Sequence, residues 1–208
     1  MLFRKGAEAH LFLEDLFGRK VLVKVRVTKN YRVTELDLLL RRQRTVREAR
    51  LLHAAKRAGV PAPTVYLVDV DNATIIMDYV EGGTLKELIK SGRLPGEELR
   101  KRLYEVGKSI GRLHRMGVIH GDLTTSNMIL SRGKIFFIDF GLGDFSRSVE
   151  DRGVDLHLMK RALESTHYDV FEEAFGIILQ GYRSSFSGAD AVIEKMWEIE
   201  RRGRYSER

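Results

Sequence analysis

Acidic and amide side chains are closely spaced in the middle of the chain, in a pattern that could do chemistry on phosphates. Asp122 lies in the string His-Gly-Asp-Leu-Thr-Thr-Ser-Asn, which ends at Asn127, and Asp139 begins a following Asp-Phe-Gly. One carboxylate can orient an attacking group or accept its proton, while the amide and the second carboxylate can hold metal ions on a triphosphate. We therefore predict a phosphoryl-transfer site with Asp122 as the catalytic residue and Asn127 and Asp139 as metal ligands.

Two short apolar runs connect these motifs. Residues 127–130 leave the first motif, residues 134–138 enter the second, and Ser-Arg-Gly between them is typical of a tight turn. The resulting hairpin would bring Asn127 and Asp139 together, as metal chelation requires. The alternative interpretation is a surface hairpin with ordinary polar turn residues.

A cation for the phosphates is expected on a strand. Residues 21–27 alternate and are rich in β-branched residues, which predicts a strand with Lys24 and Arg26 on one face. The segment Val-Leu-Val-Lys resembles the Val-Ala-Ile-Lys pattern, in which a strand lysine contacts phosphates. A solvated edge charge is the alternative for Lys24, and we interpret Arg26 as a solvated or structural charge.

A following helix offers a carboxylate partner for Lys24. Glu48 lies in a segment with helical spacing of apolar residues, and it would pair with Lys24 in a site of this kind. Two other interpretations remain open: a solvated charge on the helix face, or a capping box in which Thr45 is the N-cap. The spaced apolar residues are Val46, Ala49, Leu52 and Ala55.

Composition limits the class of protein. The 208 residues are 43% hydrophobic, enough for the core of one domain, and the absence of cysteine excludes disulfides and thiolate chemistry. No apolar stretch reaches membrane-spanning length and no signal core is evident, so we expect a cytoplasmic protein without membrane contact. The net charge of +7 suggests an anionic partner. Basic runs at 41–50 and 201–208 make direct RNA contact a hypothesis.

The chain divides near Glu81-Gly82-Gly83. Residues 1–80 are strand-rich with one helix, whereas residues 81–208 are mainly helical. We expect strands at 7–17 and 20–28, a hairpin within 64–79, and helices at 36–58, 85–90, 97–116, 151–164 and 190–202. This order of a strand lobe, a hinge and a helical lobe with the catalytic loop is that of a protein kinase. We predict an α+β fold, a minimal bilobal kinase with an antiparallel sheet in its N-lobe (1–80) and a reduced helical C-lobe (81–208).

The segment that ends the strand-rich part occupies the hinge position. Its backbone groups would hydrogen-bond the adenine of ATP, and Met77 would either guard the pocket or belong to the core. The hinge residues in question are Met77, Asp78, Tyr79 and Val80.

Nearly the whole chain resembles the small atypical protein kinase of the KEOPS (EKC) complex, archaeal type. The resemblance depends on residues 6–9, 23–26, 29–32, 36–37, 44–50, 120–127, 139–143 and 149–156. It implies a serine/threonine kinase and ATPase that uses ATP with Mg²⁺ or Mn²⁺, phosphorylates itself and supports threonylcarbamoyl-adenosine (t6A) modification of tRNA. Its implied partners are a Kae-type ATPase-like subunit, a Cgi-type small subunit and tRNA, the last through the complex or the basic C-terminal tail.

The resemblance also implies residue roles. Asp122 is the catalytic acid, Asn127 and Asp139 are metal ligands, and Lys24 with Glu48 forms the phosphate-binding pair. Asp155 matches the buried aspartate that holds the catalytic loop, and His120 is expected to be a packed, hydrogen-bonded histidine. The nucleotide-covering segment is Gly6, Ala7, Glu8 and Ala9.

Several departures from ordinary protein kinases are present. Only Gly6 remains of the Gly-x-Gly-x-x-Gly loop, and Gly121 replaces the arginine that receives an activating phosphate. No Ala-Pro-Glu follows Gly141, and only about ten residues precede the next helix. These features favour ATP hydrolysis, autophosphorylation or a partner-dependent role over broad protein phosphorylation. The alternatives are a RIO-type kinase of ribosome maturation, a non-catalytic nucleotide-binding scaffold and, more distantly, an aminoglycoside-type phosphotransferase.

Overall fold

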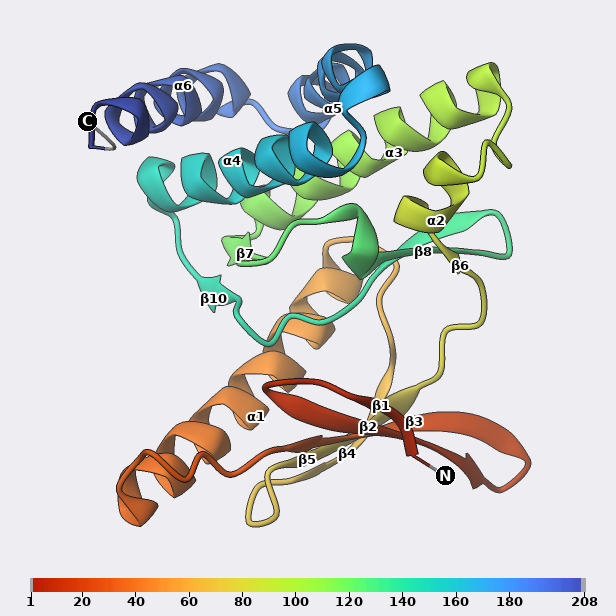
Figure 1. Cartoon of the computed structure of the whole chain (residues 1–208), viewed down its shortest axis with the longest axis vertical. Helices are drawn as coiled ribbons and strands as arrows, with labels where there is room; N and C mark the ends of the chain where they lie inside the picture. Colours follow the sequence, from red (N-terminus) through yellow and green to blue (C-terminus); the bar gives the residue numbers. More distant parts are fainter. Residues whose placement is uncertain (1, 207–208) are drawn as a thin grey trace.

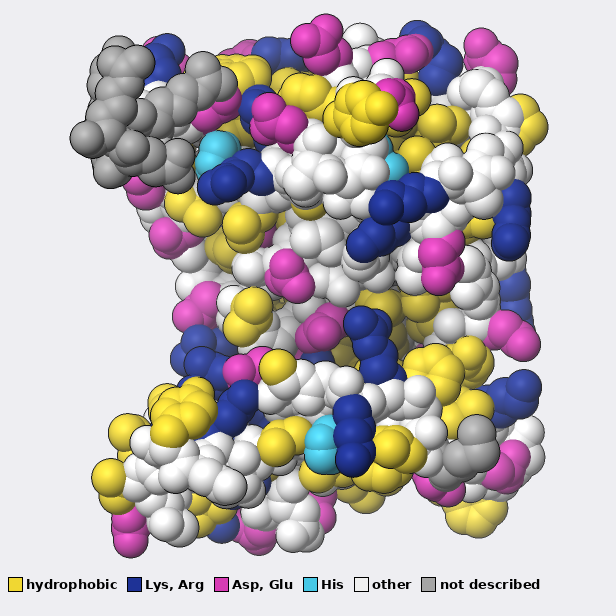
Figure 2. Space-filling model, in the orientation of Figure 1, with side chains coloured by type: hydrophobic (Ala, Val, Ile, Leu, Met, Phe, Trp, Pro, Cys, Tyr) yellow, Lys and Arg dark blue, Asp and Glu magenta, His cyan; other side chains and the backbone are white. Residues whose placement is uncertain are grey.

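The computed structural model describes residues 2–206, with side chains up to residue 203, so much of the basic tail at 201–208 lies outside the described residues. The chain forms two parts (Figure 1). A sheet and the long helix α1 (Thr34–Arg57) make up one part, and helices α2 to α6 dominate the other. The surface is hollowed between them (Figure 2).

The first part contains a five-stranded antiparallel sheet in the order β1-β2-β3-β5-β4. Its strands are β1 (Leu2–Lys5), β2 (Ala9–Leu16), β3 (Arg19–Arg26), β4 (Val65–Asp69) and β5 (Thr74–Asp78). The register pairs Lys24 of β3 with Leu11 of β2 and with Ile75 of β5. Lys24 therefore lies in the middle of a continuous ladder, which confirms the predicted strand and excludes an edge position.

Helix α1 packs beside this sheet and confirms the predicted helix. Leu51, Leu52 and Ala55 of α1 are buried in the core. The capping-box interpretation of Thr45 is wrong, because Thr45 lies inside α1 and its Oγ1 donates a hydrogen bond to the carbonyl of Arg41 at 2.7 Å. The helix begins eleven residues earlier, at Thr34. The spacing of Thr45 and Glu48 is that of a capping box, but a threonine inside a helix can instead donate its hydroxyl to the carbonyl four residues earlier.

The second part is mainly helical. It holds α2 (Leu85–Lys90), α3 (Gly96–Arg115), α4 (Val149–Thr166), α5 (Phe171–Ser185) and α6 (Ala189–Ser206), with the short 3₁₀ turns η1 (Thr125–Asn127) and η2 (Tyr168–Val170). Strands β6 (Gly83–Thr84), β8 (Met128–Ser131) and β9 (Lys134–Phe137) form a small sheet, and β7 (Val118–Ile119) pairs with β10 (Asp144–Phe145). The predicted helix at 85–90 is confirmed as α2, and Thr84 and Glu87 form a capping box at its N-terminus.

Helix α5 is the main element that the sequence pattern did not predict. Its backbone crosses that of α3 very closely, at glycines on both helices. A Cβ on Gly107 would lie 1.9 Å from the carbonyl oxygen of Ile178, and one on Gly181 would lie 2.1 Å from that of Tyr104. The glycines that permit this crossing lower the helix propensity of the segment, so packing against α3 decides its structure.

None of the helices within residues 2–206 combines the length and apolar character that a membrane crossing requires. The two-part α+β architecture agrees with the predicted bilobal fold. The segment from Gly141 to the start of α4 at Val149 is short and contains only the two-residue strand β10, so the chain lacks the long activation segment of ordinary kinases.

Candidate active site

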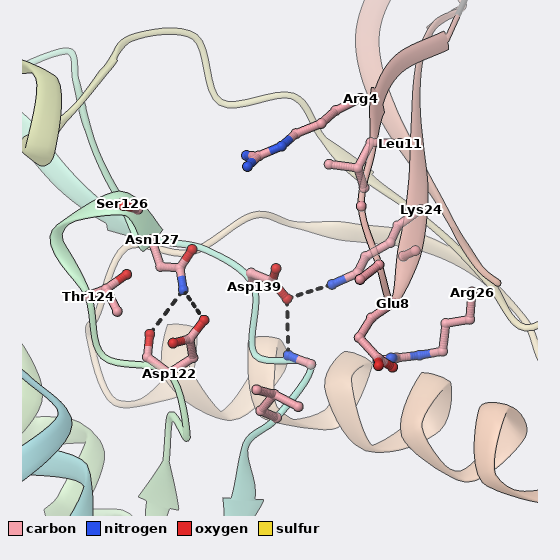
Figure 3. Close-up of a pocket in the computed structure, with 15 residues that line it drawn as sticks. Arg4, Glu8, Leu11, Lys24, Arg26, Asp122, Thr124, Ser126, Asn127 and Asp139 are labelled. Atoms are coloured by element: carbon pink, nitrogen blue, oxygen red, sulfur yellow. Dashed lines mark hydrogen bonds and ion pairs between the residues drawn. The ribbon is translucent and has the colours of Figure 1, made fainter. Parts of the chain in front are cut away.

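A cluster of charged side chains lies where the two parts meet; Lys24, Arg26 and Glu48 are buried, whereas the side chain of Asp139 is 53% exposed. The ammonium of Lys24 donates hydrogen bonds to Glu48 Oε1 and to Asp139 Oδ1, each at 2.6 Å. Arg26 donates to the other oxygen of Glu48, also at 2.6 Å. Strand β3, helix α1 and the end of the β8–β9 hairpin therefore each contribute to one cluster. The contact of Lys24 with Asp139 joins the two parts of the molecule (Figure 3).

Arg26 is a structural charge, one of the two options that the sequence left open. The residue is only 5% exposed and shares Glu48 with Lys24, which excludes the solvated alternative. Alternation along β3 places both cations on the same face. Glu48 is 1% exposed, so it is neither a cap nor a solvated face charge. The sequence feature that indicates this pairing is the spacing Lys-x-Arg. It places two cations on one face of a strand, where a single carboxylate can neutralise both.

Electrostatics keeps these groups ionised. Burial by itself would lower the pKa of Lys24, but the carboxylates of Glu48 and Asp139 outweigh it and raise the pKa above its ordinary 10.5. Burial would likewise raise the pKa of Asp139, yet Lys24 and the N–H of Gly141 lower it below its ordinary 3.8. At neutral pH the site therefore presents a cation and a carboxylate, as phosphate and metal binding require.

The catalytic loop holds Asp122 and Asn127 against each other. The amide nitrogen of Asn127 donates to the backbone carbonyl of Asp122 at 3.0 Å and to its carboxylate Oδ2 at 2.8 Å. Because the nitrogen is committed to Asp122, the amide oxygen of Asn127 lies on the opposite side, toward Asp139 (Figure 3). Oxygen donors from an amide and a carboxylate suit a hard divalent cation such as Mg²⁺, so the donor set fits the predicted metal.

The backbone around Asp139 is unusual. Asp139 has a φ of +60°, in the left-handed region that aspartate tolerates better than most residues. Its Oδ1 accepts from the N–H of Gly141 at 3.3 Å in addition to Lys24. A Cβ on Gly141 would lie 3.0 Å from that oxygen. The glycine of Asp-Phe-Gly thus leaves room for the carboxylate to face Lys24.

Asp155 of α4 holds the backbone of the catalytic loop by hydrogen bonds. Its carboxylate accepts from the backbone N–H of His120 at 2.9 Å and from that of Gly121 at 2.8 Å. Gly121 has a φ of +79°, and a Cβ there would lie 2.3 Å from the carbonyl oxygen of Leu142. Glycine at this position is therefore required by the backbone, which explains why no arginine occupies it.

His120 is fully buried, as expected for a packed histidine. Its Nδ1 accepts from the N–H of Asp122 at 3.3 Å, so Nε2 carries the proton and donates to the carbonyl of Ile138 at 3.1 Å. Burial lowers the pKa of His120, which keeps it neutral. The ring packs against Phe140 at a centroid distance of 4.4 Å. His120 thus connects the catalytic loop to the segment that carries Asp-Phe-Gly.

The structure adds a buried network that the sequence did not reveal. His114 of α3 lies between Asp155 and Tyr182 of α5, with its Nδ1 2.8 Å from the hydroxyl of Tyr182 and its Nε2 3.2 Å from Asp155. The carboxylate takes the Nε2–H, so the tyrosine donates to Nδ1. All three side chains are buried. Helices distant in sequence therefore support Asp155, and no local motif signals them.

The segment Gly6–Ala9 forms a tight turn between β1 and β2. The N–H of Gly6 donates to the carbonyl of Ala9 at 3.0 Å, and the turn lies over a cavity of about 450 Å³. Glu8 is held by Lys29 at 3.3 Å and by Arg44 at 3.0 Å. The cavity is lined by the turn and by side chains of both parts, including Lys24, Asp122, Asn127 and Asp139.

A second cavity of about 370 Å³ adjoins the first at the predicted hinge. All four hinge residues line it, and Met77 is both buried and part of the cavity wall. The N–H of Asp78 is already bonded to the carbonyl of Thr64 at 2.9 Å, and its carboxylate accepts from the N–H of Thr64 at 2.9 Å. Asp78 therefore anchors the end of β5 to Thr64, the residue before β4. Tyr79 lies edge-on to Phe3.

Comparison with known proteins agrees with this arrangement. Residues 10–168 match the protein kinase domain family. The fold resembles the crystal structure of the Rio2 kinase–ADP/Mg²⁺–phosphoaspartate complex from Chaetomium thermophilum, with a TM-score of 0.64 and 16% identity over 98% of this chain and 70% of that one. At this identity the likeness concerns the fold. The family match over residues 10–168, more than half of the chain, shows that the chain belongs to the protein kinases.

Similar proteins identify the family within the protein kinases. The chain is 51% identical to the KEOPS complex subunit Bud32 of Pyrococcus abyssi, over all of this chain and 97% of that protein. It is 45% identical to a probable bifunctional tRNA threonylcarbamoyladenosine biosynthesis protein of Methanothermobacter thermautotrophicus, over 99% of this chain but only 37% of that protein. The chain belongs to the Bud32 family of KEOPS subunits, which confirms the resemblance seen in the sequence.

Proposed function

We propose that this protein is an atypical serine/threonine kinase with ATPase activity that acts within a KEOPS complex and supports t6A modification of tRNA. The observation that carries the proposal is Lys24, held at 2.6 Å by both Glu48 and Asp139. A kinase requires the strand lysine paired with a helix glutamate and the Asp-Phe-Gly aspartate in place at the same time. Both requirements are met in one cluster.

Each site residue has a role in this proposal. Lys24 binds the phosphates and Glu48 orients it, while Asp122 orients the attacking hydroxyl or water and accepts its proton. Asn127 and Asp139 would hold Mg²⁺ or Mn²⁺, which supplies charge neutralisation to the phosphates when bound. Asp155 holds the loop through two backbone N–H groups.

The remaining nucleotide contacts are assigned to the turn and the hinge. The turn Gly6–Ala9 covers the phosphates, with Glu8 as its anchor, and the hinge residues Met77–Val80 face the adenine. The lobe boundary falls between Val80 and Glu81, in the connection from β5 to β6. This division assigns residues 1–80 to the N-lobe and 81–208 to the C-lobe.

The proposed partners follow from the relatives. The Pyrococcus protein is named as a KEOPS subunit. The bifunctional Methanothermobacter protein is matched over 37% of its length, which supports a second component of t6A synthesis in the remainder. We assign that component to a Kae-type ATPase-like subunit, with a Cgi-type small subunit and tRNA as further partners in the cytoplasm. The basic run at 41–50 lies on α1, where Arg42, Arg44 and Arg47 each pair with a carboxylate, and contact with tRNA would exchange those pairs for phosphates.

A labelling assay tests the enzymatic proposal. Release and self-incorporation of the γ-phosphate of ATP are measured with Mg²⁺ or Mn²⁺, with and without the partner subunits and tRNA. Lys24→Ala, Asp122→Ala and Asp139→Ala should each lower turnover by roughly a hundredfold or more, the scale for losing a positioned acid–base or charge-stabilising group. Asp144→Ala removes an exposed carboxylate that pairs with Arg47 and is the matched control.

The same assay separates the alternatives. Undiminished activity of Asp139→Ala would contradict the metal-site assignment. Nucleotide binding without turnover, alone and with partners, would identify a scaffold. A failure of the protein to associate with KEOPS subunits would leave a RIO-like kinase, for which the present support is a shared fold.

A further inference from the structure

Arg4 occupies a position where protein kinases carry glycine. With Gly6 as the central glycine of Gly-x-Gly-x-x-Gly, the first glycine corresponds to Arg4 and the third to Ala9. The ordinary loop uses small residues so that its backbone can approach the phosphates. A long cation at the first position needs a different explanation, and strand β1 provides one.

A bulge in β1 directs the Arg4 side chain. Leu2 pairs with Phe12, but Arg4 pairs with Leu11, so the register shifts by one residue between them. Had the first register continued, Phe3 would face Leu11 and Arg4 would lie on the opposite side of the sheet. A β-bulge commonly re-aims a side chain beside a functional site.

The shifted register puts Arg4 in line with Lys24. Arg4 pairs with Leu11, and Leu11 pairs with Lys24, so the three residues form a row across three adjacent strands. Residues directly opposite each other in an antiparallel sheet share a face. Both Arg4 and Lys24 line the two cavities of the site, and Figure 3 shows the guanidinium of Arg4 projecting from β1 toward the side of the pocket that holds Asn127 and Asp139.

Arg4 also differs from its cationic neighbours in charge balance. Lys24 and Arg26 are paired with buried carboxylates, and Lys29 and Arg44 are paired with Glu8. Among the described residues, no carboxylate or other side chain pairs with the Arg4 guanidinium. A cation without a partner, aimed into a cavity that also contains Lys24, is available for an anionic ligand.

We propose that Arg4 binds the phosphates of the nucleotide, as a second cation beside Lys24. This inference rests on the proposed kinase function and names a further binding residue of the same site. The charge of Lys24 is already shared between two carboxylates, whereas that of Arg4 is not. A guanidinium also offers parallel N–H donors that match phosphate oxygens. Arg4 thus takes over part of the task that backbone N–H groups perform in a glycine-rich loop.

Binding measurements on four proteins test this role. Dissociation constants for ATP with Mg²⁺ and for adenosine are measured by calorimetry on wild type, Arg4→Ala, Arg4→Lys and Lys5→Ala. Lys5 is the matched control, because it carries the same charge on the same strand, pairs with His10 and lies outside both cavities. All three substitutions are at exposed side chains of an edge strand, so the fold is retained.

We expect Arg4→Ala to weaken ATP binding roughly tenfold or more, the effect of losing hydrogen bonds between charged groups. Its adenosine affinity should stay unchanged, and Lys5→Ala should match wild type. Arg4→Lys should recover only part of the ATP affinity, because an ammonium restores the charge but not the parallel N–H donors. If Arg4→Ala and Lys5→Ala bind ATP equally well, the role of Arg4 is wrong while the proposed function stands. If wild type binds no ATP at all, both proposals fail.

Discussion

The carboxylate of Glu48 is predicted to be the electrostatic support of the site and of the fold around it. Its two oxygens each accept from a buried cation at 2.6 Å, and Lys24 and Arg26 are both 5% exposed. Glu48→Gln retains the shape but leaves two buried cations with the single carboxylate of Asp139. Breaking a buried ion pair by removing one partner costs about 3–5 kcal/mol, a large part of a typical total stability of about 5–15 kcal/mol.

Urea unfolding followed by circular dichroism measures this loss. At a slope of about 2–3 kcal/mol per molar urea, the midpoint should fall by about 1 M or more. Glu8→Gln is the matched control, because Glu8 also pairs with two cations, Lys29 and Arg44, but its side chain is 48% exposed. Its effect should stay within about 1 kcal/mol, as for other exposed pairs.

Arg26→Met tests the same coupling, because its effect on stability should have opposite signs in two backgrounds. Arg26→Met should destabilise the wild-type protein, since it removes a partner of Glu48. In the Glu48→Gln background the same change removes an unpaired buried cation, so it should raise stability. Equal effects of Arg26→Met in both backgrounds, or a Glu48→Gln variant as stable as the Glu8 control, would show that the cluster is not electrostatically coupled.

Three further outcomes are expected from the catalytic loop. Gly121→Ala places a Cβ 2.3 Å from the carbonyl of Leu142 at a φ of +79°, so thermal unfolding should show a loss of about 1–3 kcal/mol. Burial would raise the pKa of Asp155, but hydrogen bonds from His114 and the loop lower it below 3.8. Its contribution to stability is therefore present above pH 3.8 and is lost as the pH falls through the folded-state pKa. Asp155→Asn should be less stable than wild type at pH 6, and urea titrations at pH 6 and pH 3 should find the difference reduced at pH 3. Thr125→Val removes the buried partner of His167 Nε2, 3.0 Å away, and should cost about 1–3 kcal/mol by urea unfolding.

Local patterns sufficed to predict much of the site. The hairpin that brings Asn127 and Asp139 together depends on short-range turn chemistry, and the placement of Lys24 depends on strand alternation. The long amphipathic helix α3 and the capped helix α2 also follow from local signals. These features are predictable because each depends on residues within one element or one turn.

Features that depend on distant contacts were not predictable. Arg26 is buried only because α1 brings Glu48 against β3, and the same packing makes Thr45 an interior helix residue. Helix α5 owes its structure to contact with α3, and the link from Tyr182 through His114 crosses three helices. The sequence around Arg4 does not distinguish it from other charged residues, because the bulge in β1 that sets the direction of its side chain depends on pairing with β2.

The crossing of α3 and α5 has a consequence for how the molecule moves. With backbone atoms of Gly107 and Gly181 directly against the opposite helix, the two helices have no side-chain layer along which they could slide. Amide hydrogens on both sides of this crossing should exchange with deuterium only when the whole domain opens. Opening and closing of the nucleotide cleft must then leave α3 and α5 fixed relative to each other.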